Sequence, residues 1–198
     1  MTKITKPLEK RPYRQDRRAG QTAETRQRIV MAAVELHSTI GPARTNWSLI
    51  AERAGVQRHT LYAHFPDERD LFLACSGLFL ERDPLPDPEL WRAITRPRKR
   101  LQVGLGAIYA WFGRNAGALA NILRDAEIHD LTRDTVALRQ GPMMARYEEV
   151  LGDGLDARQR ALLHLALGFS TWRSLVKESG MSRDDAVAAM TDVVCGKK

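Results

Sequence analysis

Residues 46–62 of this 198-residue chain read NWSLIAERAGVQRHTLY. Asn46 is a residue type that caps helix N-termini, and the apolar positions after it predict a short helix over 47–54. Gly55 follows at a point where a tight turn needs a positive φ, a conformation that costs glycine little. This stretch therefore predicts two short helices joined by a tight turn.

The second helix of the pair is expected over 58–65, because the residue before Pro66 avoids the helical region. Ala51 and Ala54 are small enough to let two steeply crossed helices approach each other. A further set of apolar residues is expected to fill the space between them: Ile50, Val56, Leu61 and Phe65. The second helix would then present its polar residues outward: Gln57, Arg58, His59, Thr60, Tyr62 and His64.

Helical patterns also flank this pair. Apolar residues recur at helical spacing from Thr22 to Ile40, with Thr22 or Thr25 as the cap and Gly41 and Pro42 as the stop. After the pair, Asp67 is expected to cap a longer helix. Three helices in this order are typical of a helix-turn-helix DNA-binding domain, whose second short helix reads the major groove.

The segments Ile50–Val56, Thr60–Tyr62 and Phe65–Pro66, with the helix before them and Leu71 after them, closely resemble the TetR family of bacterial repressors. The resemblance covers roughly 50 contiguous residues at many fixed spacings. It implies an α-helical homodimer with an N-terminal DNA-binding domain and a C-terminal domain that binds an inducer.

The resemblance and the exposed polar positions together predict the DNA-contacting set: Arg44, Asn46, Ser48, Gln57, Arg58, His59, Thr60, Tyr62, His64 and Arg69. Arg58 and His59 are the candidates for base contacts, since arginine pairs well with guanine O6 and N7. Thr60, Tyr62 and His64 are expected at phosphates or thymine methyls. The alternatives are that Tyr62 packs between helices and that His64 is a neutral surface residue.

Three positions depart from the family pattern. Gln57 stands where a serine is common, and Trp47 replaces a smaller aliphatic residue. Glu68 stands where the family often places a lysine against phosphate, so either Glu68 or Arg69 faces the DNA. The operator sequence therefore cannot be carried over from relatives.

The net charge of +7 is confined to one end of the chain. Residues 1–66 hold 12 Lys and Arg against 5 Asp and Glu, whereas residues 67–198 hold 19 of each. A basic end on a balanced body is expected of a protein that meets a polyanion with that end. Residues 1–21 are predicted to be a flexible basic arm, either a solvated tail or a clamp on DNA phosphates or the minor groove.

The rest of the chain also reads as helical, so the predicted fold class is all-α. A proline-rich joint precedes helices expected over 89–95, 98–114, 117–130, 135–151, 156–178 and 183–195. Pro142 falls inside the fourth of these, which either kinks or begins later. The domains are predicted as a basic arm (1–21), a helix-turn-helix domain (22–66) and a helical effector-binding and dimerisation domain (67–198).

The C-terminal region carries large, adaptable side chains that predict a pocket for a hydrophobic or aromatic small-molecule effector, the alternative being ordinary core. The pocket candidates are Tyr109, Trp111, Phe112, Met143, Tyr147, Phe169 and Trp172, with Met144 beside them. The helices over 156–178 and 183–195 are apolar on several faces, which predicts a second subunit as their cover.

Other function classes receive little support. Asp125, Glu127, His129 and Asp130 lie close together but are interpreted as a solvated face, so no metal is expected. No cofactor motif and no convincing nucleophile or acid–base pair is present, so an enzyme is not expected. A protein with two distant cysteines, no secretory signal and no bilayer-spanning stretch is expected in the cytoplasm. The alternatives kept open are an architectural DNA-binding protein without effector and an all-α enzyme.

Overall fold

The computed structural model describes the backbone of residues 12–196 and the side chains of residues 19–196. Within that range the chain forms helices and no strand, which confirms the all-α prediction. The elements are α1 (Pro12–Thr39), η1 (Pro42–Arg44), α2 (Trp47–Ala54), α3 (Arg58–His64), α4 (Glu68–Arg82), η2 (Pro88–Trp91), α5 (Pro97–Ala126), α6 (Asp130–Leu151), α7 (Ala157–Leu167), α8 (Phe169–Trp172), the π-helical turn η3 (Arg173–Glu178) and α9 (Arg183–Cys195). None of these helices combines the length and the apolar character that crossing a bilayer requires.

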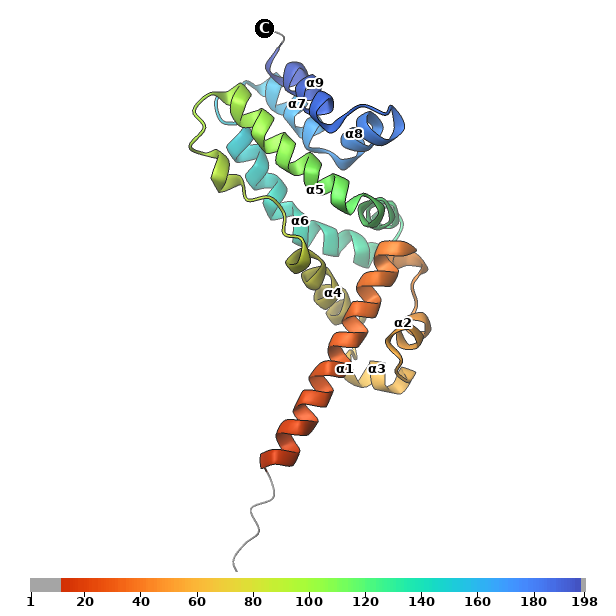
Figure 1. Cartoon of the computed structure of the whole chain (residues 1–198). Coiled ribbons are helices and arrows are strands. Elements are labelled where there is room, and N and C mark those ends of the chain that lie inside the picture. Colours follow the sequence, from red (N-terminus) through yellow and green to blue (C-terminus); the bar gives the residue numbers. More distant parts are fainter. Residues whose placement is uncertain (1–11, 197–198) are drawn as a thin grey trace, which may run out of the picture.

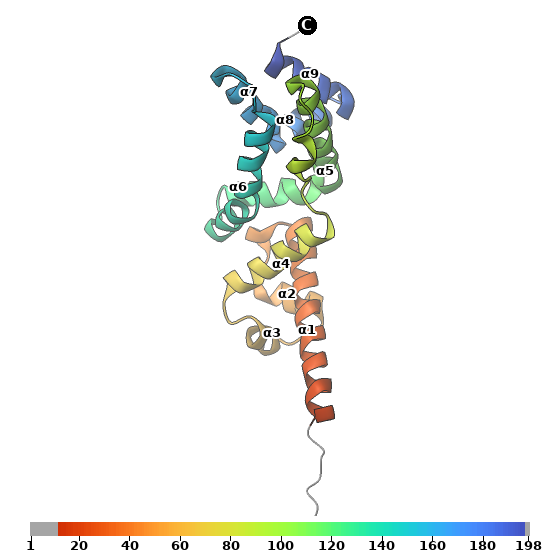
Figure 2. The same ribbon diagram turned by 90° about the vertical axis from the view of Figure 1, so that its left-hand side faces the viewer.

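The molecule is elongated, with two hydrophobic cores at its two ends. Helices α1, α2 and α3 lie at one end, α5 to α9 lie at the other, and α4 connects them (Figure 1). Figure 2 shows the same division after a quarter turn. The N-terminal core extends beyond residue 66, because Leu71 and Cys75 of α4 are buried in it.

The first helix begins ten residues earlier than predicted. We expected a flexible arm up to residue 21 and a cap at Thr22 or Thr25, but α1 starts at Pro12. The Thr25 hydroxyl donates to the Gln21 carbonyl within the helix, so Thr25 is not a cap. Proline is favoured in the first turn of a helix, and a single glycine such as Gly20 costs only about 1 kcal/mol relative to alanine. The remaining predicted arm residues, 1–11, lie outside the described residues.

The two helices predicted over 98–114 and 117–130 are one continuous helix, α5. Gly113 and Gly117 lie inside it without breaking it. The helix contributes buried residues on both sides of these glycines, including Phe112 and Leu119. This packing outweighs the modest helix-propensity cost of two glycines.

Residues 156–178 were predicted as one helix, but the structure divides them. Gly168 adopts an extended conformation, with φ −71° and ψ 133°, and separates α7 from α8. The break turns Phe169 and Trp172 into the core, where their ring centroids lie 5.5 Å and 6.0 Å from that of Phe112. Tertiary packing of these aromatic rings therefore overrides the continuous helical pattern.

Two smaller differences concern the helices before and after α5. The helix expected over 89–95 is only the four-residue turn η2. The helix expected from 135 begins at Asp130 and contains Pro142 inside it. The helix predicted over 183–195 is confirmed as α9.

Polar side chains of α5 bind the end of α1 and the turn after it. The Asn121 amide donates to the carbonyls of Ser38 and Thr39, each at 2.9 Å. The buried carboxylate of Asp125 accepts from the Ala43 amide at 2.9 Å. Gly41 lies against this carboxylate with φ +100°, and a Cβ there would overlap it. The two ends of the molecule are thus joined by direct hydrogen bonds at the C-terminal end of α1.

Candidate nucleic-acid interface and ligand cavity

The turn between α2 and α3 has the geometry that its residues predicted. Gly55 adopts φ 63° and ψ 39°, the left-handed conformation that favours glycine. Ala51 and Ala54 are buried where the helices approach, and Leu61 of α3 is completely buried. The inner face of α3 is therefore held firmly, and its outer face is left to solvent.

The two short helices differ in how their N-termini are capped. The Asn46 side chain accepts from the Leu49 amide at 3.0 Å, which confirms its predicted role as a cap. Gln57 is the N-cap residue of α3 but forms no side-chain cap hydrogen bond. Free backbone N–H groups at a helix N-terminus are donors for phosphate oxygens.

The predicted DNA-contacting residues of α3 lie together on its outer surface. Gln57, Arg58, His59 and Tyr62 are exposed, and Thr60 and His64 are half-buried. The Tyr62 ring stacks on Trp47 with centroids 5.0 Å apart, and its hydroxyl accepts from Arg58 at 3.2 Å. Tyr62 thus packs on α2 and still keeps 41% of its surface exposed. The larger Trp47 supplies a platform that orients Tyr62 and, through it, Arg58.

Arginine 26 connects α1 to the end of α3. Its guanidinium donates to the His64 carbonyl at 2.9 Å and lies 3.9 Å from the centroid of the buried Phe65 ring. The orientation of α3 is therefore tied to α1, which sequence reasoning did not predict. The available signal was an arginine three residues before Ile29, which is the first buried residue of α1 among those whose side chains the structure describes.

Three of the other predicted DNA contacts lie at the starts of the helices before and after α3, whereas the fourth, Arg44, does not. Ser48 and Asn46 are exposed at the start of α2, and both Glu68 and Arg69 are exposed in the first turn of α4. Asp67 caps that helix by accepting from the Arg69 amide at 2.9 Å, as predicted. Arg44 is exposed in η1, which packs against α5 and so lies at the junction with the C-terminal region.

The C-terminal region contains a cavity of about 200 Å³ between α5, α6 and the Gly168 break. Five of the seven predicted pocket residues line it: Trp111, Phe112, Met143, Tyr147 and Phe169. The other two do not. Tyr109 is fully buried with its hydroxyl donating to the Ala166 carbonyl, and Trp172 packs behind Phe112 and Phe169. Both are core residues, the alternative kept open for every member of the set.

The cavity also has lining residues that were not predicted, of which Gln140 is the most informative. Gln140, Met143, Met144 and Tyr147 occupy one face of α6 at helical spacing, and all four line the cavity. That spacing could have identified Gln140 as a lining residue from the sequence. The apolar remainder are residues of the ordinary core type: Leu85, Pro86, Ile108, Leu119, Leu123 and Leu167.

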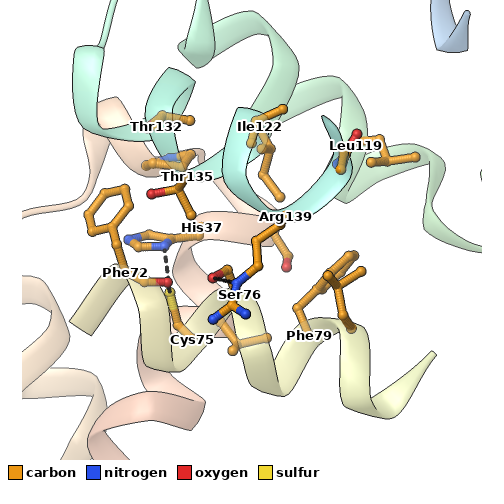
Figure 3. A pocket seen from close by; sticks show the side chains of 16 residues that line it. His37, Phe72, Cys75, Ser76, Phe79, Leu119, Ile122, Thr132, Thr135 and Arg139 are labelled. Carbon is orange, nitrogen blue, oxygen red and sulfur yellow. Dashed lines mark hydrogen bonds between the residues drawn. The ribbon is translucent and has the colours of Figure 1, made fainter. Parts of the chain in front are cut away.

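A smaller cavity of about 70 Å³ lies at the junction of the two ends, between α1, α4, α5 and α6 (Figure 3). His37 and Cys75 meet in its wall, with Nδ1 and Sγ 3.5 Å apart. Burial lowers the pKa of His37 to about 4 and raises the pKa of Cys75 to about 12, so both are neutral near pH 7. Arg139 of α6 donates to the Leu73 carbonyl at 2.7 Å and to the Ser76 hydroxyl at 3.1 Å, both on α4.

The interpretation of residues 125–130 as a solvated face is wrong for Asp125, which is buried, whereas Glu127 and Asp130 are exposed. Asp125 accepts from Ala43 and from the Arg124 guanidinium, and His129 is 2.7 Å from the Thr132 hydroxyl. Within the described part of the chain, no group of three or more His, Cys, Asp or Glu residues is placed to hold a metal ion.

Comparisons with known proteins agree with the helix-turn-helix geometry. Residues 29–75 match the model of the bacterial regulatory proteins, tetR family. The HTH-type transcriptional regulator AcrR of Shigella flexneri is 47% identical over 49 residues, which are 25% of this chain and 23% of that protein. The match thus spans about a quarter of the curated relative.

Solved structures extend the similarity in fold to most of the chain. A putative TetR-family transcriptional regulator from Rhodococcus sp. superposes with a TM-score of 0.60 at 21% identity, covering 86% of this chain and 98% of that one. The multidrug binding protein EbrR, solved with imidazole, gives a TM-score of 0.59 at 20% identity and covers 85% and 93%. Residues 29–75 are therefore similar to the N-terminal domain of the tetR family of bacterial regulatory proteins, and most of the chain shares the fold of these solved structures.

Proposed function

We propose that this protein is a homodimeric transcriptional repressor that binds duplex operator DNA through α3 and leaves it when a small molecule occupies the C-terminal cavity. The observation that carries the proposal is the polar outer face of α3. That face is exposed while Leu61 and Phe65, on the inner face, are completely buried. A helix held so firmly on one side presents fixed side chains to a groove on the other.

The assignment of roles follows the geometry of that face. Arg58 and His59 lie in the first turn of α3 and are proposed to reach base edges. Thr60, Tyr62 and His64 are proposed to contact the DNA backbone. Arg69 is proposed to reach phosphate from the start of α4, with Glu68 turned aside.

The direct test is selection of bound fragments from random duplex DNA, followed by titration at several salt concentrations. We expect recovery of a sequence with two similar half-sites whose centres are about 34–36 Å apart, as a dimer requires. We expect affinity to fall steeply with salt, because several Lys and Arg per subunit release counterions from phosphates. Enrichment of no sequence would favour an architectural DNA-binding protein, and binding that ignores salt would contradict the phosphate contacts.

The dimer is proposed to form through α7 and α9. Leu165 of α7 and Val193 of α9 are large apolar side chains exposed by 53% and 48%, and α7 packs against α9. A second copy would cover them and would hold the two α3 helices at a fixed spacing. Leu165→Glu should shift the protein from dimer to monomer in sedimentation equilibrium and weaken operator binding. The same change at Leu90, which is 75% exposed on η2, a turn that packs against α5 and α6, is the control.

The effector site is proposed to be the cavity of about 200 Å³. Its aromatic and methionine side chains adapt to planar apolar molecules. EbrR, a protein of similar fold, is described as a multidrug binding protein. The signal is proposed to reach the DNA-binding end through α4, which begins at the end of α3 and is held by Arg139 of α6.

A further inference from the structure

The lining of the C-terminal cavity carries no ionisable side chain other than the Tyr147 phenol. That hydroxyl is already used, since it donates to the Pro86 carbonyl at 2.7 Å. The indole N–H of Trp111 is also used, because it donates to the Asp83 carbonyl at 2.9 Å. Both aromatic side chains therefore present ring surface to the cavity, with their polar atoms occupied elsewhere.

Gln140 is the exception among these lining side chains. Within residues 19–196, its side-chain amide has no hydrogen-bond partner, although the residue is half-buried on the cavity face of α6. An amide offers two donors and one acceptor oxygen, so Gln140 can bind a polar atom of a ligand in the cavity. A ligand that supplies one matching polar atom would pair with this amide in a lining whose other side chains are apolar or already hydrogen-bonded.

The nearest cationic side chain along α6 cannot serve an anionic ligand. Arg139 lines the junction cavity, where α4 holds its guanidinium (Figure 3). A carboxylate or sulfonate placed in the C-terminal cavity would lose its hydration without gaining a cationic partner there. A cationic ligand would equally meet no carboxylate in the lining. The cavity is thus suited to uncharged molecules.

The volume limits the size of such a molecule. An apolar protein cavity of about 150 Å³ accommodates benzene. The cavity here, of about 200 Å³, suits one aromatic ring or two fused rings. Ring surfaces of Trp111, Phe112 and Phe169 in its wall favour a planar occupant.

We infer that the effector is an uncharged aromatic molecule of one or two rings with a single hydroxyl or carbonyl, and that Gln140 determines specificity by binding that polar atom. This inference rests on the proposed function and names the ligand class of its effector site. Gln140 and Leu119 also line the junction cavity, so they form the partition between the two cavities. A ligand that binds Gln140 would therefore act on the partition next to α1 and α4.

The test compares three probes on the full-length protein by calorimetry: naphthalene, 1-naphthol and 1-naphthoate. Wild type should bind 1-naphthol about five- to tenfold more tightly than naphthalene, the net value of one hydrogen bond to the Gln140 amide. It should bind 1-naphthoate at least tenfold more weakly than 1-naphthol, because the carboxylate finds no partner. In Gln140→Met, a substitution of similar length, the preference for 1-naphthol over naphthalene should disappear.

Gln102→Met is the matched control, since Gln102 is half-buried on α5 and lines neither cavity. It should keep the wild-type preference. Gln140→Asn retains an amide on a shorter side chain and should bind naphthalene normally while losing part of the preference, which separates recognition from folding.

The possible results separate the two proposals. If neither neutral probe binds wild type, the effector cavity itself is rejected, and this inference with it. If both bind but Gln140→Met keeps the preference for 1-naphthol, the inference about Gln140 is wrong while the effector cavity stands. If 1-naphthoate binds more tightly than 1-naphthol, the uncharged class is wrong.

Discussion

The helix-turn-helix and the C-terminal cavity differ in how tightly their side chains pack. In the former, small and completely buried residues such as Ala51 and Leu61 hold the backbone so that the polar residues outside have fixed positions. In the latter, large aromatic residues leave a space of about 200 Å³ between them. This difference in packing suits the two proposed partners. A DNA groove needs side chains at fixed positions, whereas a small molecule needs an open space to occupy.

The largest expected effect is on the free energy of unfolding, and it concerns the junction between these two regions. His37 is buried there with its pKa lowered to about 4, by burial first and by the neighbouring His129 second, while Asp125 acts in the opposite direction. Because the folded pKa lies below the unfolded value of 6.5, the unfolded chain binds the proton more readily. Stability is therefore complete above about pH 6.5 and is lost as the pH falls towards 4.

We expect this residue to remove about 3 kcal/mol of unfolding free energy across that pH window. Urea unfolding of wild type and of His37→Gln, at a series of pH values, measures the contribution as the difference between the two curves. Parallel curves would show that His37 is not a neutral buried group in the folded protein.

The second expected effect concerns the DNA-binding end alone. Arg58→Ala should weaken binding to the selected operator by about 1–3 kcal/mol and relax specificity at one base pair. Arg133→Ala is the control, because Arg133 is exposed on α6, outside both α3 and the proposed dimer helices, and pairs with Asp130. Fluorescence anisotropy with the operator and with point variants of it measures both quantities. A uniform loss across all sequences would instead assign Arg58 to a phosphate.

The smallest expected effects on stability come from a glycine-to-alanine substitution made once in each region. Gly55→Ala forces a Cβ into φ 63° and should destabilise the protein by about 1 kcal/mol, although the nearest atom to that Cβ, on Arg28, is 3.8 Å away. Gly113→Ala lies inside α5, where a Cβ would meet Trp172 at 3.9 Å, an ordinary contact. It should stabilise by about 0.5–1 kcal/mol. Thermal unfolding shows whether the signs are opposite; equal signs would contradict the distinction between a required and an incidental glycine.

The same contrast explains how much could be predicted from the sequence. The helix-turn-helix was predicted almost residue by residue, because Asn46, Gly55 and Pro66 act through their own backbone geometry. In the C-terminal region, the break at Gly168 and the continuity through Gly113 depend on Phe169, Trp172 and distant partners. Two glycines with the same intrinsic preference have opposite outcomes there, and only the packing distinguishes them.

The candidate sites divide in the same way. The exposed positions of α3 follow from helical spacing, so the DNA-contacting set could be proposed in advance. The cavity set was partly anticipated from residue type, but residue type did not separate Tyr109 and Trp172 from the lining residues. Gln140 was missed because the pocket candidates were chosen as aromatic and methionine side chains, although helical spacing places Gln140 on the same face of α6 as Met143 and Tyr147.

Helix α1 has a mechanical consequence because it is held at two points. Asn121 binds its last turn, and Arg26, 13 residues earlier, binds the end of α3. These points are separated by about 20 Å along a helix that rises about 1.5 Å per residue. A tilt of about 5° at the junction would therefore displace α3 by about 2 Å, whereas a hydrogen bond to a base edge tolerates only about 0.5 Å. In the proposed function α1 would act as a lever arm, because a movement smaller than a side chain would take α3 out of register with the groove while every helix stays folded.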